Sequence, residues 1–263
     1  MNIIVCVKQT PETVEADLTI GPTGRDVIRD DLVYTINEWD NYAIEEAIRL
    51  KETHGGQVTV VTMGGEDSED TLRRCLAMGA DEAILLSDDM FEHGDARATA
   101  QVLVQCIKGR PFDLILTGSQ AADVGQGQVG LILAQKLNIP HAALVIKLEM
   151  ENGAAIVHRE LEGNMEEVLK IALPALLSIQ TGINDPRYVS IMGIRKVRTK
   201  TIETMDAEDL DLTEAQTGES GSWTRLTRMY LPVAEKTAEI IAGRPEEAAA
   251  RLAEIIKNNG GLA

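Results

Sequence analysis

The sequence predicts an α/β fold with a Rossmann-like, mostly parallel sheet that is extended by antiparallel strands. Three observations carry this prediction. Short apolar runs alternate with amphipathic helical segments over residues 1–137. A glycine-rich stretch, GSQAADVGQGQVG at residues 118–130, joins one of these runs to a helix. Beyond residue 140 the chain changes to short extended segments separated by turn residues.

The first half of the chain is expected to alternate strands with helices. The predicted strands cover 3–7, 57–62, 82–86 and 113–117, and the predicted helices cover 37–54, 67–78, 96–107 and 130–137. In the first of these helices, Tyr42, Ala43 and Ala47 cluster on one face. Gly64 and Gly65 end the second strand. Such alternation builds βαβ units, and ligands bind at the carboxyl ends of their parallel strands.

The second half is expected to add antiparallel strands and a polar tail. The predicted strands cover 143–149, 154–159, 167–171 and 176–181. Asn152-Gly153 between the first two is typical of a tight hairpin turn. The chain is basic and irregular from Asn184 to Lys200, and then acidic over 205–219, a stretch predicted to be too polar to bury much. A last helix is predicted over 245–258.

Composition excludes several classes of function. The formal net charge is −17 and aromatic residues make up 3% of the chain. This balance argues against binding nucleic acid or an anionic membrane surface, because both rest on Lys and Arg contacts to phosphate. No apolar run is long enough to cross a bilayer, and Met1 leads straight into a predicted strand without a signal peptide. We therefore expect a cytoplasmic protein that is not embedded in a membrane.

The cysteines agree with a reducing compartment. There are three of them, and none is spaced as a CxxC pair. Cys75 and Cys106 fall within helical patterns and are predicted to be core residues.

The glycine-rich loop at residues 118–130 is the strongest candidate site. A loop that leaves a strand and opens a helix offers free backbone N–H groups and the positive end of the helix dipole, which suits a phosphate or pyrophosphate. No Lys or Arg lies between Gly118 and Ala134, so backbone donors would do most of the binding. The alternative is that the glycines serve only tight turns. Three glycines, at 125, 127 and 130, favour the phosphate site.

Other chemistries fit less well. Gly125, Gly127 and Gly130 match the GxGxxG pattern, and Glu149 follows about twenty residues later, but the loop does not follow the first strand, as an ordinary NAD site would. GxxxxGK[ST], HExxH and GxSxG motifs are absent, and the four histidines lack metal-ligand spacing. Asp123 is either a site residue or a helix cap. The chain is therefore predicted to carry a nucleotide rather than to break bonds.

Several motifs in order resemble the beta (small) subunit of electron transfer flavoproteins from Met1 to about Lys200. They are VCVKQ (5–9), AIEEAIRLK (43–51), LAMGAD (76–81), GSQA (118–121) with QVG (128–130), HRELEG (158–163) with LPA (173–175), and NDPRY (184–188). The resemblance implies a heterodimer with an alpha subunit that carries the redox-active FAD. It also implies that this chain binds a second nucleotide, either AMP or another FAD.

The resemblance further implies which residues contact that nucleotide. They are Cys6, Asn37, Glu38, Trp39, Asp40, Met63, Gly118, Gln120, Ala121, Asp123, Val124, Gly125, Gln126, Gly127, Gln128, Val129, Gly130 and Ala134. Lys8-Gln9 and the QVG motif resemble the bifurcating and anaerobic branch of the family, which favours FAD. Asn37-Glu38-Trp39 differs from the family's usual Asn-Pro-aromatic. A second FAD would make the complex an NADH-oxidising flavoprotein, whereas AMP would make this chain a scaffold.

The resemblance also implies partners and a domain division. An acyl-CoA dehydrogenase-type flavoenzyme would dock on a recognition region that includes Arg187, Tyr188, Ile191 and Lys196, unless Ile191 is an ordinary buried isoleucine. Electrons would pass on to an NAD-linked partner or a membrane quinone oxidoreductase. The expected divisions are a nucleotide-binding domain over 1–183, a partner-recognition region over 184–204, and a C-terminal arm and helix over 205–263 that dock on the alpha subunit.

Two alternatives from other classes stay open on the residues alone. One is a stand-alone adenine-nucleotide sensor of the universal-stress type on a similar fold. The other is an NAD-dependent dehydrogenase that turns over a small alcohol or hydroxy acid by itself. The basic region and acidic tail favour the electron-transfer subunit, because a stand-alone sensor has no need of a C-terminal third that packs poorly on itself.

Overall fold

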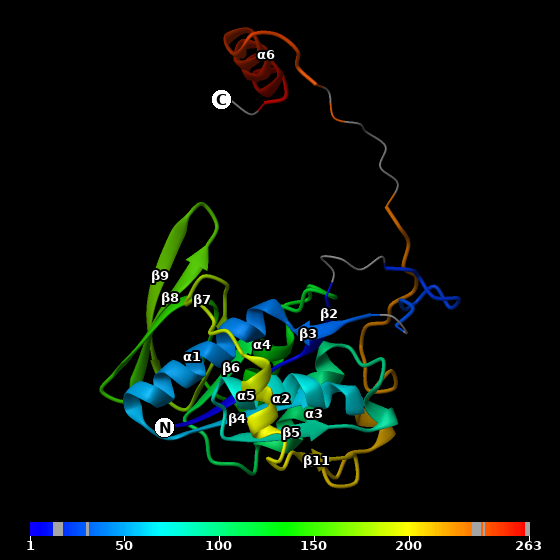
Figure 1. Ribbon diagram of the computed structural model, residues 1–263, viewed down its shortest axis with the longest axis vertical. Coiled ribbons are helices and arrows are strands. Elements are labelled where there is room, and N and C mark those ends of the chain that lie inside the picture. The colour runs from blue at the N-terminus through cyan, green and yellow to red at the C-terminus, as the bar shows by residue number, and fades with distance from the viewer. Residues whose placement is uncertain (13–17, 30–31, 233–237, 239, 261–263) are drawn as a thin grey trace.

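The fold is a nine-stranded sheet with helices on both faces (Figure 1). The computed structural model describes residues 1–12, 18–29, 32–232, 238 and 240–260. Within these residues the sheet order is β11-β5-β4-β1-β6-β10-β7-β8-β9. The α/β fold class with a mostly parallel sheet is therefore confirmed.

The strands fall into a parallel part and an antiparallel extension. Strands β1 (Asn2–Cys6), β4 (Gln57–Met63), β5 (Glu82–Leu86), β6 (Leu114–Gly118), β10 (Ala175–Ile179) and β11 (Glu203–Met205) pair in parallel. Strand β7 (His141–Glu151) pairs in parallel with β10 and antiparallel with β8 (Ala154–Leu161), which in turn pairs with β9 (Met165–Ala172). A separate small sheet joins β2 (Gln9–Pro11) to β3 (Tyr34–Ile36), and the sequence patterns did not predict it.

Helices cover the sheet in two groups. The α-helices are α1 (Glu38–His54), α2 (Glu69–Met78), α3 (Ala96–Ile107), α4 (Val129–Leu137), α5 (Ile191–Val197) and α6 (Pro245–Asn258), with short 3₁₀ turns η1 (Glu66–Ser68), η2 (Asp89–Phe91) and η3 (Glu214–Gln216). Residues of α1 and α2 pack in one apolar cluster, and residues of α3 and α4 pack in the other. Two cores therefore lie on opposite faces of one sheet.

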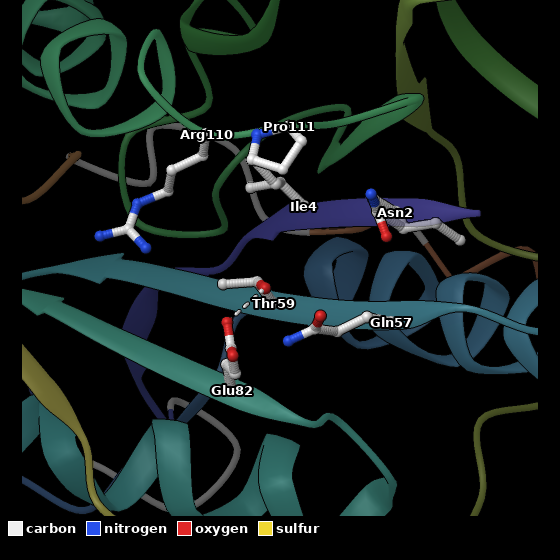
Figure 2. A pocket seen from close by; sticks show the side chains of 8 residues that line it. Asn2, Ile4, Gln57, Thr59, Glu82, Arg110 and Pro111 are labelled. Atoms are coloured by element: carbon white, nitrogen blue, oxygen red, sulfur yellow. Dashed lines mark hydrogen bonds between the residues drawn. The ribbon is translucent and has the colours of Figure 1, made fainter.

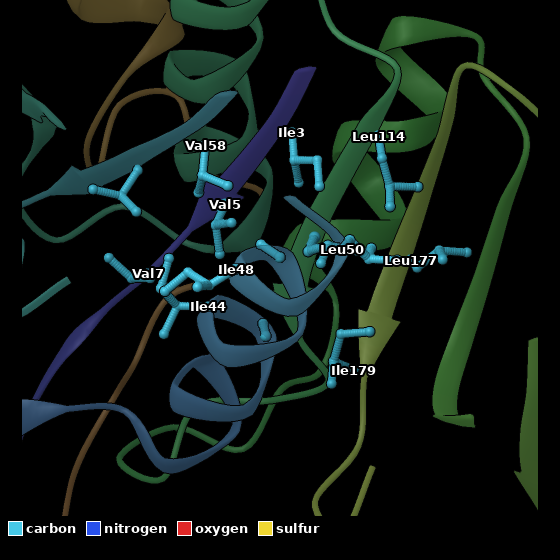
Figure 3. Close-up of a cluster of buried hydrophobic side chains, with 14 of the residues drawn as sticks. Ile3, Val5, Val7, Ile44, Ile48, Leu50, Val58, Leu114, Leu177 and Ile179 are labelled. Atoms are coloured by element: carbon cyan, nitrogen blue, oxygen red, sulfur yellow. The ribbon is translucent and has the colours of Figure 1, made fainter. Parts of the chain in front are cut away.

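Strand β1 is apolar without interruption from Ile3 to Cys6 because the sheet is covered on both faces. Successive strand residues point to opposite faces, so Ile3 and Val5 join the α1 side while Ile4 and Cys6 join the α3 side. Figure 3 shows the α1 side, where Ile44 and other α1 residues pack against β1. Because both faces are covered, residues 3–6 are all apolar, and the one polar residue of the strand, Asn2, lies exposed at its start.

The strand predicted over 176–181 was wrongly assigned as antiparallel. Strand β10 lies between β6 and β7 and runs parallel to both, with Leu177 opposite Leu116 and Ala142. All five of its residues are buried. An unbroken apolar run is typical of such a central parallel strand, so ALLSI carried the signal. Because β10 follows the antiparallel strands β7, β8 and β9 along the chain, its position in the sequence suggested another antiparallel strand.

Two predictions for the C-terminal third were also wrong. The segment expected to be irregular contains α5, which Ser190 caps by accepting the N–H of Gly193 at 3.1 Å. The acidic stretch over 205–219 does bury apolar side chains, because Ala207, Leu210 and Leu212 join the α3-side core while their acidic neighbours face outward. Helix α6 has no buried residue and lies apart from the sheet in Figure 1.

Candidate nucleotide-binding site

The glycine-rich loop leaves the carboxyl end of β6 and leads into α4. Residues 122–128 are all exposed. Gly125 and Gly127 have φ angles of +59° and +61°, in the left-handed region that side chains strain. The loop conformation therefore favours glycine at both positions.

Six consecutive backbone donors lie at the start of α4 and just before it. The N–H groups of Gln126 through Leu131 meet no protein acceptor among the residues that the structure describes. The N-cap, Gln128, contributes no side-chain hydrogen bond either. Free donors at a helix N-terminus suit an anionic group, since the helix dipole adds to them. The residues present therefore fit the phosphate of a nucleotide.

Gly130 has a packing role beneath this row of donors. A Cβ at Gly130 would lie 2.5 Å from the hydroxyl of Thr117, the penultimate residue of β6. The Thr117 hydroxyl is buried and has no hydrogen-bond partner among the described residues. The third glycine therefore lets α4 sit close against the strand end, in addition to any contact with a ligand.

Asn37 holds the other side of the loop. Its side chain is 1% exposed, donates from Nδ2 to the carbonyl of Gln120 at 2.8 Å, and accepts the N–H of Ala122 on Oδ1 at 3.0 Å. Asn37 is the residue that precedes α1, so the first helix of the fold anchors the loop after β6. A bidentate side-chain amide of this kind fixes the loop backbone from 120 to 122.

Asp40, in the first turn of α1, ties two strand ends together. Its Oδ2 accepts the N–H of Lys8 at 2.7 Å, just after β1, and its Oδ1 accepts the N–H of Gly118 at 2.9 Å, at the end of β6. Burial raises the pKa of Asp40 to about 7, although the hydrogen bonds from Lys8 and Gly118 oppose that rise. Asp40 is thus a buried acid that titrates near neutral pH.

Glu38 and Trp39 differ in their surroundings. Glu38 is exposed, whereas the indole Nε1 of Trp39 donates to Oε1 of Gln180 at 2.7 Å. Of the four residues from 37 to 40, Asn37, Trp39 and Asp40 have polar side-chain atoms engaged by the protein.

A cation at the loop comes from outside it. Lys8 reaches Asp123 with an Nζ–Oδ2 distance of 2.6 Å, and both side chains are partly exposed. The sequence of the loop, which has no Lys or Arg, predicted backbone donors alone, and Lys8 lies outside that range. The signal was available, because Lys8 directly follows β1 and the carboxyl ends of parallel strands share one edge. Asp123 is therefore an ion-pair partner in this state, rather than a helix cap.

The remaining predicted contacts divide between the edge and the core. Cys6 ends β1 and is buried, and burial raises the pKa of its thiol well above the usual range. Met63 ends β4 and is half-buried at the same edge. Ala134 is fully buried in the α3-side core, beneath the helix start. Cys75 and Cys106 are buried as predicted, and burial raises the pKa of their thiols to about 12 and about 11.

The residues expected to meet a dehydrogenase lie on and before α5. Tyr188 is 89% exposed and Ile191 is 69% exposed, so Ile191 is not an ordinary buried isoleucine. Lys196 is exposed as well. Arg187 instead anchors the segment to α1, with its Nε 2.8 Å from Glu45 and its Nη1 2.8 Å from Glu52. The structure thus presents an apolar residue on a tethered short helix.

Neither of two surface cavities coincides with the loop. Figure 2 shows a cavity of about 100 Å³ lined by Asn2, Gln57, Glu82 and neighbours, where Thr59 donates to Glu82 at 3.3 Å. These residues begin β1, β4 and β5, so this cavity lies at the edge of the sheet opposite the loop, and it is too small for a nucleotide. A second cavity, of about 300 Å³, lies between β3 and α2.

The described residues include neither a membrane-spanning helix nor a cluster of metal ligands. No helix there combines the length and the apolar character that a bilayer crossing requires. Over the same residues, no three His, Cys, Asp or Glu side chains gather in a way that suits a metal ion.

Comparison with known proteins places the chain beside one group. The family model described as "Electron transfer flavoprotein domain" matches residues 26–210. The protein named "Electron transfer flavoprotein subunit beta" from Methylophilus methylotrophus is 40% identical over 260 residues, covering 97% of this chain and 98% of its own. The protein of the same name from Bacillus subtilis (strain 168) is 40% identical, with 98% of both chains covered. A protein from Acetobacterium woodii, "Caffeyl-CoA reductase-Etf complex subunit CarD", is also 40% identical, over 92% of each chain.

Proposed function

The chain belongs to the electron transfer flavoprotein beta-subunit family, and on that premise we propose that it works as half of a heterodimer with an alpha subunit. The complex carries electrons between an acyl-CoA dehydrogenase-type flavoenzyme and a further redox partner, on the NAD-linked or the membrane quinone side. The redox-active FAD belongs to the alpha subunit, and this chain binds a second nucleotide, FAD or AMP.

The observation that carries the nucleotide assignment is the row of N–H groups from Gln126 to Leu131, which meet no acceptor in the part of the chain that the structure describes. These donors would hold the phosphate, with Gly127 giving the backbone its turn. Lys8 supplies positive charge beside them. A bound FAD supplies electron-transfer chemistry, whereas AMP supplies none and leaves this chain a scaffold that positions its partner.

The hydrogen bonds of Asn37 and Asp40 would keep the site assembled whether FAD or AMP is bound. Asn37 holds the loop at Gln120 and Ala122, and Asp40 holds the ends of β1 and β6. A preorganised donor row loses less conformational entropy on binding than a flexible loop. The two residues therefore support the site without supplying the phosphate donors.

The choice between FAD and AMP is not decided by family membership. CarD, named as a subunit of a caffeyl-CoA reductase-Etf complex, is as similar to this chain as the two beta subunits are, at 40% identity. The sequence around Lys8 and Gln128 favours FAD. We therefore take FAD as the working assignment and AMP as the alternative that the experiment must separate.

The deciding experiment is the nucleotide content of the complex co-purified with its alpha subunit, measured by denaturation and chromatography. Two FAD and no AMP per heterodimer would support a second flavin here, and one FAD with one AMP would support a scaffold. A chain that purifies as a monomer or homodimer, binds ATP and carries no flavin would instead support the nucleotide-sensor alternative.

A matched pair of variants ties that content to the loop. Gly127→Val forces a β-branched side chain into a left-handed backbone and should remove this chain's nucleotide while the alpha-subunit FAD remains. Gly153→Val places the same strain in the β7–β8 hairpin turn, where φ is +77°, and should leave both nucleotides in place. Unchanged occupancy in Gly127→Val would overturn the phosphate assignment.

The exposure of two groups of apolar residues supports the two proposed docking surfaces. Tyr188, Ile191 and Met192 form an exposed apolar group at α5, which we assign to the dehydrogenase. The C-terminal extension is assigned to the alpha subunit, because α6 exposes Leu252 and Ile256 and none of its residues is buried. An amphipathic helix without a partner in its own fold is a usual element of a subunit interface.

A further inference from the structure

The segment at residues 219–229, here called the arm base, accepts and donates hydrogen bonds to the body, and the carboxylate of Asp95 makes three of them. Asp95 precedes α3, and its two oxygens serve different elements. Oδ1 caps α3 by accepting two N–H groups of its first turn at 2.9 and 3.0 Å. Oδ2 accepts the N–H of Trp223 at 2.8 Å, and both the N–H and the hydroxyl of Thr224 at 2.9 and 3.0 Å.

The neighbours of Asp95 strengthen the same contact. The Asp95 N–H donates to the hydroxyl of Ser222 at 2.8 Å. The guanidinium of Arg97 lies 4.5 Å from the ring centroid of Trp223 and also donates to the carbonyl of Gly221. The start of α3 therefore contacts four consecutive residues of the arm base.

A second element holds the arm base from the N-terminal part of the chain. Arg25 donates to the carbonyl of Leu226 at 2.8 Å and to Glu219 at 2.7 Å. The N–H of Met229 donates to the carbonyl of Gly24 at 2.7 Å. The arm base is thus bonded both to the start of α3 and to the segment around Arg25.

Beyond the arm base the chain changes character. Tyr230, Leu231 and Ile240 are all at least 70% exposed, and over Pro245–Asn258 no residue is buried. A densely bonded base and an exposed apolar end suit a segment that another chain captures. Fixing the base reduces the ordering entropy that this capture costs.

We infer that Asp95 is a positioning residue for subunit assembly, because its carboxylate sets the direction in which the C-terminal arm leaves the body. The inference deepens the proposed function and rests on the assignment of the arm to the alpha subunit. Burial works against ionisation of Asp95, but hydrogen bonds from Ala98, Thr224 and Trp223 lower its pKa below the ordinary value. The Asp95 carboxylate is therefore charged, and hydrogen bonds to a charged group are stronger than those between neutral groups.

Asp95→Asn in the full chain separates the two roles of this side chain. An asparagine Oδ1 keeps the cap on α3, since Asn is as good an N-cap as Asp. Its Nδ2 would replace Oδ2 and bring a donor against the three donors of Trp223 and Thr224. The substitution should therefore release the arm base and leave α3 intact.

Two measurements report whether the arm base is released. Trypsin cleavage after Arg225 and Arg228 should become about tenfold faster in the complex, because the base opens more often. The heterodimer Kd, measured by mass photometry on dilution, should rise about tenfold because the arm is no longer preorganised. Thr224→Val removes only the hydroxyl donor and should move both readouts in the same direction, by less, without touching α3.

Asp88→Asn is the matched control. Asp88 has the same divided geometry, with one oxygen accepting the N–H of Met90 at 2.8 Å and the other accepting the N–H of Ala207 at 3.0 Å. Because Ala207 lies in the packed acidic stretch, before the arm base, this variant should change neither trypsin cleavage after Arg225 and Arg228 nor the heterodimer Kd.

The outcomes are separable. Faster cleavage and a higher Kd in Asp95→Asn, but not in Asp88→Asn, would support the inference. Faster cleavage with an unchanged Kd would overturn it while leaving the arm's docking in place. If the wild-type arm is cut equally fast with and without the alpha subunit, the arm does not dock there, and both the inference and that part of the proposed function fail.

Discussion

Asp40 accepts the backbone N–H of Gly118 at 2.9 Å, so the first turn of α1 is bonded to the last residue of β6. The same carboxylate accepts the N–H of Lys8 at 2.7 Å. Both bonds lie directly beneath the glycine-rich loop that follows β6. The candidate nucleotide site is therefore built on a buried acid whose protonation changes near neutral pH.

The buried carboxyl of Asp40 predicts a specific pH dependence of stability. Because burial raises its folded pKa to about 7 from the ordinary value of 3.8, the folded state binds this proton more tightly than the unfolded state. The stabilisation is complete below the unfolded pKa and is lost as pH rises towards 7. Within that window this group should lower the free energy of unfolding by up to about 1.4 kcal/mol per pH unit.

Asp40→Asn checks that dependence by urea unfolding at pH 5, 6, 7 and 8. In this variant the free energy of unfolding should lose the pH dependence that Asp40 contributes. The free energy by which the variant is less stable than the wild type should therefore be larger at pH 5 than at pH 8. Asp113→Asn is the control, because Asp113 also accepts a strand N–H, that of Asn2 at 2.7 Å, but at the opposite edge of the sheet. A deficit in Asp40→Asn that is constant with pH would contradict the prediction.

Gly118 should tolerate no side chain. A Cβ there would lie 2.3 Å from Oδ1 of Asp40 and 2.7 Å from the Cβ of Trp39. Gly118→Ala should therefore destabilise by roughly 1–3 kcal/mol through overpacking, as measured by urea unfolding. Gly125→Ala meets no atom within 4 Å and should cost only about 1–2 kcal/mol of backbone strain, confined to the loop.

The two glycine variants should also differ in what they disturb. Gly118→Ala should lower stability whether or not nucleotide is bound, because its clash lies in the α1–β6 contact. Gly125→Ala should act mainly on nucleotide retention. If Gly118→Ala has the same urea midpoint of unfolding as the wild type, α1 does not approach β6 as closely as described.

Lys8 and Asp123 predict opposite effects on nucleotide affinity. Their ion pair is partly exposed, so it adds at most about 1 kcal/mol to stability. Lys8→Met removes the cation beside the donor row and should weaken nucleotide binding about tenfold with little change in Tm. Asp123→Asn releases Lys8 towards an anion and should strengthen binding. Isothermal titration of nucleotide-stripped complex measures both, and weakening by both variants would assign the pair a purely structural role.

Ile191 predicts where the dehydrogenase docks. Ile191→Asp places a charge on the exposed apolar group at α5 and should slow electron exchange with the dehydrogenase by roughly tenfold or more, with flavin content unchanged. Val168→Asp is the control, because Val168 is comparably exposed, at 58%, but lies on β9. Stopped-flow flavin reduction measures the rate. Equal rates in Ile191→Asp and wild type would place the docking surface elsewhere.

Much of this protein was accessible from local patterns in the sequence. Alternating apolar runs and helical spacing determined the α/β class, because burial on both faces of a parallel sheet leaves a continuous apolar signature in each strand. The motifs from Val5 to Tyr188 determined the family. Glycines at 125 and 127 determined the loop, because a left-handed backbone is a property of one residue and needs no distant partner.

Tertiary structure alone decided what lies beside what. It placed β10 between β6 and β7, brought Lys8 to Asp123, set Asn37 against the loop, and joined Asp95 to Trp223. It also buried Leu210 and Leu212 from a stretch whose composition is acidic. Each of these contacts joins residues that are far apart along the chain. Local periodicity does not specify them, because such a partner is selected only when the packed sheet brings the two segments together.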